Sequence, residues 1–431
     1  MNPHIKKPDG SPADNNRIEI GPSNLAFEEW SELNLDIPNL ERMRQSRLNR
    51  IVAELNKRDY AGVLCFDPLN IRYATDSSNM HLWITHNPSK AVFISASNYV
   101  VLWDFHRCEH LSAHLKLIDE IRTKDVGMYY FVAGDKEAEV AKRFAQQIDE
   151  LLRIHGGSNR RLAIDKIEIP GLRALDNVGV DIQNGMQLME HARSVKCVDE
   201  INAMRCAIRS CEHSVAEMRN ALRPGISEVE LWSILHQGNI KRGGEWIETR
   251  LLNSGPRTNP WMQEAGPRII QDGDLLAFDT DLIGPYGMAA DMSRTWYCGD
   301  GQPTLEQRKL HRIALEHIQA NIQLLKPGIS LKELTEKGHR LPEIYRDQRY
   351  SVMMHGIGMC DEYPTIYYPE DFIEGAFDYV LQAGMTLCVE AYVGAKGGKD
   401  GVKLEEQVLI TENGIEILTH CPFDKKLMVG F

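Results

Sequence analysis

The sequence predicts an α/β protein of two domains, and three observations lead to that prediction. Short apolar and β-branched runs alternate with helical patterns in the first half of the chain, as in a sheet flanked by helices. The second half contains the tetrapeptide Pro-Gly-Ile-Ser twice, at 224–227 and at 327–330, between similar leucines and glutamates. We interpret this repeat as an internal duplication. A chain of 431 residues is also too long for one simple core.

The composition excludes several classes of function. A net charge of −12 argues against a nucleic-acid partner and offers no attraction to an anionic membrane. The chain has no run of about 18 apolar residues, so no transmembrane helix is expected, and its start has no apolar stretch typical of a secretory signal. The nine cysteines form no CxxC pair, which favours reduced thiols and a cytoplasmic location.

Residues 1–40 are polar and rich in Pro, Gly and Asn, so we expect an extended N-terminal arm with little structure of its own. Phe27 and Trp30 are the only large aromatic residues in this arm. Aromatic side chains bury much apolar surface. We therefore expect these two to anchor the arm on the body of the protein or on a partner subunit.

The next segment, 41–192, is expected to be an α/β domain. A helix is predicted over about 41–58, because apolar residues recur on one face. Short strand-like runs follow at 61–66, 91–95, 99–103, 161–165 and 178–182.

Residues 193–431 are expected to form the second domain, which contains the duplication. A long helix is predicted over about 198–222. In each repeat Pro and Gly end one helix, and the serine, Ser227 or Ser330, caps the next. Two related halves would face each other across a cleft, where binding sites often lie.

An aspartate cluster is the strongest chemical signal in the sequence. Residues 275–281 are predicted to form a buried strand in which Asp279 and Asp281 share one face. A turn at Pro285 would bring Asp291 roughly opposite Asp281. Three converging carboxylates repel one another unless a cation neutralises them. A single Arg294 cannot satisfy all three, so we predict a divalent metal.

Three more side chains complete the predicted donor set. His355 lies in a Gly-rich apolar turn, and Glu390 and Glu405 interrupt apolar strands. The neighbouring Glu406 fits an outward, solvated side chain instead. Asp281 and Asp291 together with His355, Glu390 and Glu405 provide two Asp, one His and two Glu. Such a set suits a pair of ions such as iron, manganese, cobalt or zinc, bridged by shared carboxylates.

These motifs, taken in order, resemble those of the creatinase, prolidase and methionine aminopeptidase family. The resemblance covers about 41–418 and includes DMSRT, HGIG, a strand Glu and GVKLEE. It implies a creatinase-like N-terminal α/β domain, a C-terminal pita-bread fold with a pseudo-twofold axis, two metals and a homodimer. It also implies that the metals are bound by five residues: Asp281, Asp291, His355, Glu390 and Glu405.

The departures from the peptidase pattern point to another substrate. Asp361 stands where peptidases carry a second His after HGIG, Trp261 stands where they carry a loop His, and Asp279 is an additional acid. An aromatic and an anion beside two metals suit a substrate with a carboxylate at one end and an alkylated cation at the other. Losing both histidines argues against peptide hydrolysis.

This pattern is similar to that of one branch of the family, the dimethylsulfoniopropionate lyases of marine bacteria. That likeness implies a small zwitterionic sulfonium substrate, an iron centre with Asp279 as an extra ligand, and Asp361 as the general base of a β-elimination. Tyr350 matches a Tyr of that branch and is expected to orient the substrate or the base. Trp261 is expected to contact the sulfonium.

Two alternatives remain open from the sequence. The first is a metallohydrolase on the same fold, either an Xaa-Pro aminopeptidase or prolidase, or a creatinase-like enzyme. The second is a non-catalytic binding protein, which the complete ligand set disfavours.

Overall fold

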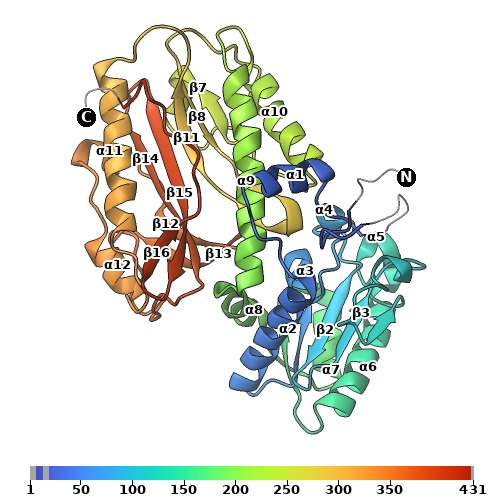
Figure 1. Ribbon diagram of the computed structural model, residues 1–431. Helices are drawn as coiled ribbons and strands as arrows, with labels where there is room; N and C mark the ends of the chain where they lie inside the picture. The colour runs from blue at the N-terminus through green and yellow to red at the C-terminus, as the bar shows by residue number, and fades with distance from the viewer. Residues whose placement is uncertain (1–5, 13–18, 429–431) are drawn as a thin grey trace. The chain divides into compact units, whose positions relative to one another are not determined.

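The computed structural model describes residues 6–12 and 19–428, and these form two compact units (Figure 1). One unit consists of residues 39–193 with 19–20, and the other of residues 194–428 with 6–12 and 21–38. None of the described helices is long and apolar enough to cross a membrane.

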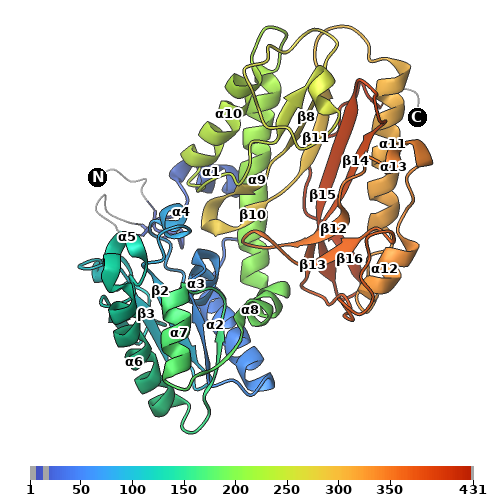
Figure 2. The same ribbon diagram turned by 180° about the vertical axis from the view of Figure 1, so that it is seen from behind.

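The unit of residues 39–193 is built on a six-stranded sheet in the order β4-β3-β2-β1-β5-β6. Its strands are β1 (Gly62–Cys65), β2 (Ala91–Ser95), β3 (Val100–Trp103), β4 (Glu120–Arg122), β5 (Arg161–Ile164) and β6 (Asp181–Asn184). Its longer helices are α2 (Leu40–Lys57), α3 (Pro68–Thr75), α6 (Glu137–His155), α7 (Ile169–Asn177) and α8 (Gly185–Ser194). Figures 1 and 2 show α2 and α7 on opposite sides of this sheet.

The predicted elements of this unit agree well with the observed ones. The helix at 41–58 is α2, and four of the five strand predictions coincide with β1, β2, β3 and β5. The fifth is shifted, because β6 begins only at Asp181, after a turn in which Gly179 has a positive φ of 74°.

The expectation of an extended N-terminal arm is wrong for residues 24–32. They form helix α1 (Asn24–Glu32), capped by the side chain of Ser23. Phe27 and Trp30 are buried, and the indole of Trp30 donates a 3.0 Å hydrogen bond to the carbonyl of Cys206. The anchoring role on the body of the protein is therefore confirmed. Residues 1–5 and 13–18 of the expected arm lie outside the described residues.

The second unit contains the same sequence of elements twice. The first half comprises α9 (Val198–Ala221), α10 (Glu228–Lys241), β7 (Leu252–Ser254), β8 (Leu275–Asp279) and β11 (Ser293–Tyr297). The second comprises α11 (Leu305–Ile322), α12 (Leu331–Lys337), β12 (Val352–Ile357), β14 (Thr386–Gly394) and β15 (Gly401–Thr411). The strand order β11-β8-β7 of one sheet repeats as β15-β14-β12 in the other, which β13 (Asp361–Tyr367) and β16 (Gly414–Ile417) extend at its edges.

The repeated tetrapeptide has the same structure in both halves. Each glycine has a positive φ, 95° at Gly225 and 85° at Gly328, which glycine adopts without strain. Gly225 donates to the carbonyl of Ile270 at 2.9 Å, and Gly328 donates to that of Leu381 at 2.8 Å. The following serines cap α10 and α12 as predicted. The duplication therefore extends to individual hydrogen bonds.

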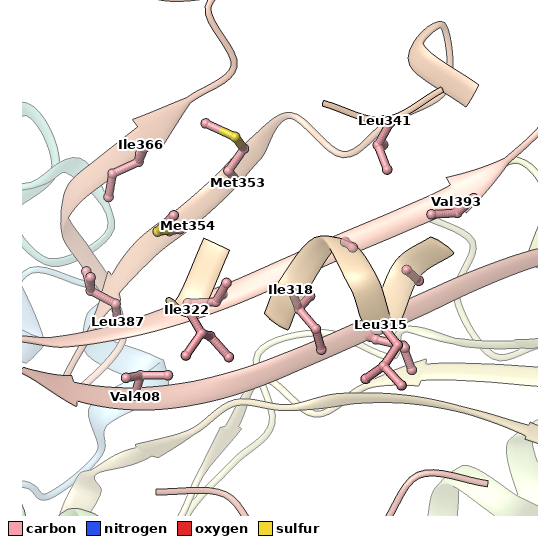
Figure 3. Packing of buried hydrophobic residues seen from close by; sticks show 14 of the residues in the cluster. Leu315, Ile318, Ile322, Leu341, Met353, Met354, Ile366, Leu387, Val393 and Val408 are labelled. Atoms are coloured by element: carbon pink, nitrogen blue, oxygen red, sulfur yellow. The ribbon is translucent and has the colours of Figure 1, made fainter. Parts of the chain in front are cut away.

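The core of the second half lies between α11 and the larger sheet. Figure 3 shows Leu315, Ile318 and Ile322 of α11 facing Leu387 of β14 and Val408 of β15. These five side chains are buried, and their packing fixes the β14–β15 hairpin from one side. The β11 and β15 strands of the two halves are joined through Thr295, whose hydroxyl donates to the Lys403 carbonyl at 2.9 Å.

Candidate metal centre

The first part of the centre lies where the β8–β11 pairing is interrupted. Ser293 pairs with Asp279, and the ladder resumes where Ala290 of β10 (Ala289–Ala290) pairs with Leu282 of β9 (Leu282–Ile283). Asp281 and Asp291 lie in this gap, and the Asp281 amide approaches the Asp291 carboxylate at 3.4 Å. The predicted opposition of Asp291 and Asp281 is confirmed.

The prediction that Asp279 and Asp281 belong to one continuous strand is wrong. Strand β8 ends at Asp279, and Asp281 has a φ of 37°, which an extended strand does not allow. Asp279 consequently approaches Glu390 and Glu405, whereas Asp281 approaches Asp291 and Asp361.

The second part of the centre comes from the larger sheet. His355 lies on β12 rather than in a turn, and Glu390 pairs directly with Glu405 across β14 and β15. His355 Nε2 is 3.5 Å from Glu405 Oε1, 3.6 Å from Glu390 Oε1 and 3.8 Å from Asp291 Oδ2. Two donor atoms on one tetrahedral metal at about 2.1 Å lie roughly 3.4 Å apart, so this spacing fits a common metal.

The orientation of His355 also fits a metal ligand. Its Nδ1 lies 3.0 Å from the Gly356 carbonyl and donates to it in the neutral imidazole. That bond leaves the lone pair on Nε2, the nitrogen that faces the carboxylates.

Asp361 begins β13 and lies at the open side of the centre. Its side chain is 63% exposed, and its Oδ1 is 3.7 Å from His355 Nδ1. It also forms a group with Asp281 and Asp291, whose oxygens lie within 4.8 Å of one another. Asp361 is therefore close to the predicted metals and accessible from outside.

Lys403 is a central residue of the site that sequence reasoning missed. Its ammonium lies 2.7 Å from Asp279 Oδ2, 2.8 Å from Glu405 Oε2 and 2.9 Å from Glu390 Oε2. The side chain is completely buried. The sequence contained an indication of this role. Lys403 is two residues before Glu405 on one strand, and its side chain therefore points to the same face of the sheet.

Each of the three carboxylates around Lys403 keeps one oxygen free. Oδ1 of Asp279 and Oε1 of both Glu390 and Glu405 are buried without a hydrogen-bond partner among the described residues. A buried carboxylate oxygen without a partner is costly. These atoms therefore fit oxygen ligands to a metal.

Arg294 and Glu406 differ from their expected roles. Arg294 does not neutralise the aspartates; it pairs with Glu406 at 2.9 Å and donates to the carbonyls of Glu405 and Cys421 at 2.6 Å. Glu406, expected to be solvated, is buried. Since Glu406 follows Glu405 on a strand, it points to the opposite face, and that face is also covered in this protein.

Without metal, five of the six acids of the centre have raised pKa values. Burial, with Asp279 nearby, raises the pKa of Asp281 to about 8, and burial raises the pKa of Glu390 to about 8 despite Lys403. The pKa of the more exposed Asp361 is also raised, because the surrounding protein partly desolvates its carboxylate and Glu405 and Asp279 are nearby, although His355 opposes this shift. The pKa of Glu405 is lowered, because Lys403 and His355 outweigh its burial.

The two aromatic residues predicted for substrate binding lie beside Lys403. The Lys403 ammonium is 4.9 Å from the ring centre of Tyr350 and 5.8 Å from that of Trp261. Tyr350 is half-buried, but Trp261 is only 8% exposed and stacks on Tyr392 at 5.9 Å. Tyr350 therefore offers a more accessible ring than Trp261.

Within residues 6–12 and 19–428, three groups of side chains could hold a cation. They are Asp291, His355, Cys388 and Glu405; Asp281, Asp291 and Asp361; and Asp279, Glu390 and Glu405. The first two share Asp291, as expected when a carboxylate bridges two ions. Their nitrogen and oxygen donors suit borderline or hard divalent metals.

Comparison with known proteins gives two kinds of relative. The profile of metallopeptidase family M24 matches residues 202–412. Over 425 residues the chain is 52% identical to the dimethylsulfoniopropionate lyase DddP of Roseovarius nubinhibens and 49% identical to that of Roseobacter denitrificans. Each match covers 97% of this chain and 95% of the relative.

Solved structures confirm the fold. A dipeptidase from Pyrococcus horikoshii matches with a TM-score of 0.71 at 19% identity, covering 88% of this chain and 98% of its own. An Xaa-Pro dipeptidase from Bacillus anthracis matches with a TM-score of 0.70 at 20% identity and the same coverage. The pita-bread fold of the prolidases is thus the fold of this chain, whereas identities this low carry no information about the substrate.

Proposed function

Because the chain belongs to the dimethylsulfoniopropionate lyase family DddP, we propose that it is a carbon–sulfur lyase that cleaves dimethylsulfoniopropionate to dimethyl sulfide and acrylate. The observation that carries this proposal is 52% identity over nearly the whole chain. The carboxylate-rich centre supports it, because it contains side chains that could bind metals and a further exposed acid, Asp361.

The reaction is a β-elimination. A base removes a proton from the carbon next to the substrate carboxylate, the electron pair forms the double bond of acrylate, and the carbon–sulfur bond breaks. The sulfur leaves as neutral dimethyl sulfide, so no acid is needed there. We propose that the metals are held by Asp279, Asp281, Asp291, His355, Glu390 and Glu405. When bound, they supply Lewis acidity toward the substrate carboxylate.

Asp361 is the proposed base. It is exposed at the open side of the centre and lies near His355. Its raised pKa makes it a stronger base than an ordinary aspartate. Tyr350 is proposed to orient the substrate, since its half-buried ring faces the centre beside Lys403. Trp261 is proposed as a lesser contact to the sulfonium, because little of its ring is accessible.

The direct test is to measure dimethyl sulfide in the headspace over purified protein. We expect release from dimethylsulfoniopropionate that stops with a chelator and returns with added Fe²⁺. Parallel assays on Xaa-Pro dipeptides test the metallohydrolase alternative. Dipeptide hydrolysis without dimethyl sulfide would refute the lyase proposal.

The role of Asp361 is tested by Asp361→Asn. Loss of a general base lowers the rate by about 10²- to 10⁴-fold, so we expect a fall of that size with unchanged metal content. Because Asp361 also groups with Asp281 and Asp291, metal analysis decides between two roles. Loss of one ion per chain would make Asp361 a ligand instead.

The finer features are also proposals. We propose iron as the metal and a homodimer as the assembly, both from the resemblance to the lyase family. The cytoplasmic location is supported by the spacing of the nine cysteines, which form no CxxC pair and suit a reducing compartment. Metal analysis of protein purified without added metal, and sedimentation of the same sample, would test the first two.

A further inference from the structure

One of the three candidate cation positions is already filled by the protein itself. The group Asp279, Glu390 and Glu405 has the spacing of a metal site, yet the Lys403 ammonium lies 2.7–2.9 Å from all three carboxylates. We propose that Lys403 is a resident cation that excludes a metal from this position, so that the remaining oxygens of these three acids serve metals at the two positions that share Asp291. This inference rests on the proposed metal centre.

The contacts of Lys403 are saturated. Besides the three carboxylates it donates to the Ser293 hydroxyl at 2.8 Å, so the three protons of the ammonium meet four acceptors. The side chain is completely buried, with the rings of Tyr350 and Trp261 within 6 Å. If this buried ammonium lost its partners, water could not solvate it in their place. Displacing it by a metal would therefore be costly.

Lys403 also selects which oxygens are left for metals. It takes Oδ2 of Asp279 and Oε2 of both Glu390 and Glu405, and the other oxygen of each has no hydrogen-bond partner among the described residues. The free oxygens of Glu390 and Glu405 are those that lie 3.5–3.6 Å from His355 Nε2. Lys403 therefore acts as a positioning residue for the proposed ligands.

The charge balance favours the same arrangement. The three groups together contain six carboxylates. Two divalent ions and one ammonium leave a single negative charge, which is what a catalytic base requires. A third divalent ion beside Lys403 would instead give the buried centre a net positive charge, which is unfavourable. Without Lys403, three divalent ions would balance the six acids.

The test is to count metal ions in Lys403→Met and in Lys403→Arg. At saturating Mn²⁺ we expect two ions per chain in the wild type and in Lys403→Arg, which keeps the charge. Lys403→Met is expected to bind three, and its crystal structure should contain an ion between Asp279, Glu390 and Glu405. An unchanged count of two in a folded Lys403→Met protein would overturn the proposal.

A second measurement uses the wild-type protein and does not depend on the stability of a variant. Anomalous diffraction from Mn²⁺-loaded crystals should give two peaks, with Lys403 still hydrogen-bonded to its three carboxylates. A peak at the ammonium position would refute the inference. Neither experiment measures dimethyl sulfide, so failure of the lyase proposal and failure of this one are distinguishable.

Discussion

At the scale of single residues, the second unit depends on charges that are buried in pairs. Arg294 is a clear case, because its guanidinium joins β11 to Glu406, to the Glu405 carbonyl and to the Cys421 carbonyl. It also lies 4.3 Å from the ring centre of Phe423. Arg294 thus holds strand β15, which carries the proposed ligand Glu405, in place from the face opposite the proposed metal centre.

Removing this charge should be costly. Arg294→Met leaves Glu406 buried without its partner, and breaking a buried ion pair typically costs about 3–5 kcal/mol. We expect a loss of this size in the free energy of unfolding, measured with urea. The double variant Arg294→Met/Glu406→Gln should recover part of it, since no lone charge remains. Equal losses in the single and double variants would contradict this interpretation.

The individual site residues show what a sequence pattern predicts and what it does not. The length of the turn between the two strands sets their pairing register. It therefore correctly predicts that Asp291 lies opposite Asp281. The interruption between β8 and β9 is not visible in the residue pattern, so the common face expected for Asp279 and Asp281 was wrong. Lys403 was missed because a lysine in a strand is usually solvated, and only the assembled sheet shows that this one is enclosed.

At the scale of helices, the two repeated serines should contribute alike. Ser227 accepts from the Glu230 amide at 3.2 Å, and Ser330 accepts from the Glu333 amide at 3.0 Å. Loss of such a cap costs about 1 kcal/mol, so Ser227→Ala and Ser330→Ala should each lower the unfolding free energy by about that amount. Ser233→Ala, on the exposed part of α10, is the control and should change it by less than about 0.5 kcal/mol.

Helix α11 carries a buried histidine that should make the stability of the protein sensitive to acid. His317 is buried and lies 3.0 Å from His339 Nδ1 and 3.2 Å from the Tyr368 hydroxyl. Burial, with His339 adding to it, lowers the pKa of His317 to about 3. The unfolded chain therefore takes up a proton below about pH 6.5 that the folded chain does not.

Stability must consequently fall as the pH drops from about 6.5 toward 3, by about 1.4 kcal/mol per pH unit for this residue. His317→Gln should reduce the slope of unfolding free energy against pH by that amount between pH 6 and 4. Urea unfolding at several pH values measures both slopes. Parallel lines for the variant and the wild type would show that His317 does not cause the acid sensitivity.

At the scale of the whole molecule, the duplication was the most useful pattern in the sequence. The repeated Pro-Gly-Ile-Ser tetrapeptide predicted two helix ends, two helix caps and a duplicated unit. It could do so because Pro, Gly and Ser act on the local backbone. The helix α1 inside the expected arm was not predicted, since its stability comes from burying Phe27 and Trp30 rather than from its own propensity. A helix that is stabilised by tertiary packing of only two aromatic residues is difficult to predict from an otherwise polar sequence.

The whole fold should respond to metal in a way that depends on pH. In the metal-free protein the pKa values of Asp281 and Glu390 are raised to about 8, above their ordinary values of about 4. Between those limits the folded chain holds protons that the unfolded chain releases. The stability of the metal-free protein must therefore fall as the pH rises from about 4.5 to 8.

Bound metals take the place of these protons, so the stabilisation by metal should be larger at pH 8 than at pH 6. We expect the rise in melting temperature on adding Mn²⁺ to chelator-treated protein to be greater at pH 8. Titration in weakly buffered solution at pH 6 should also release protons, and fewer at pH 8. A metal-induced rise that is equal at both pH values, with no proton release, would mean that the acids are not neutralised by the metals and that the centre is balanced by Lys403 and His355 alone.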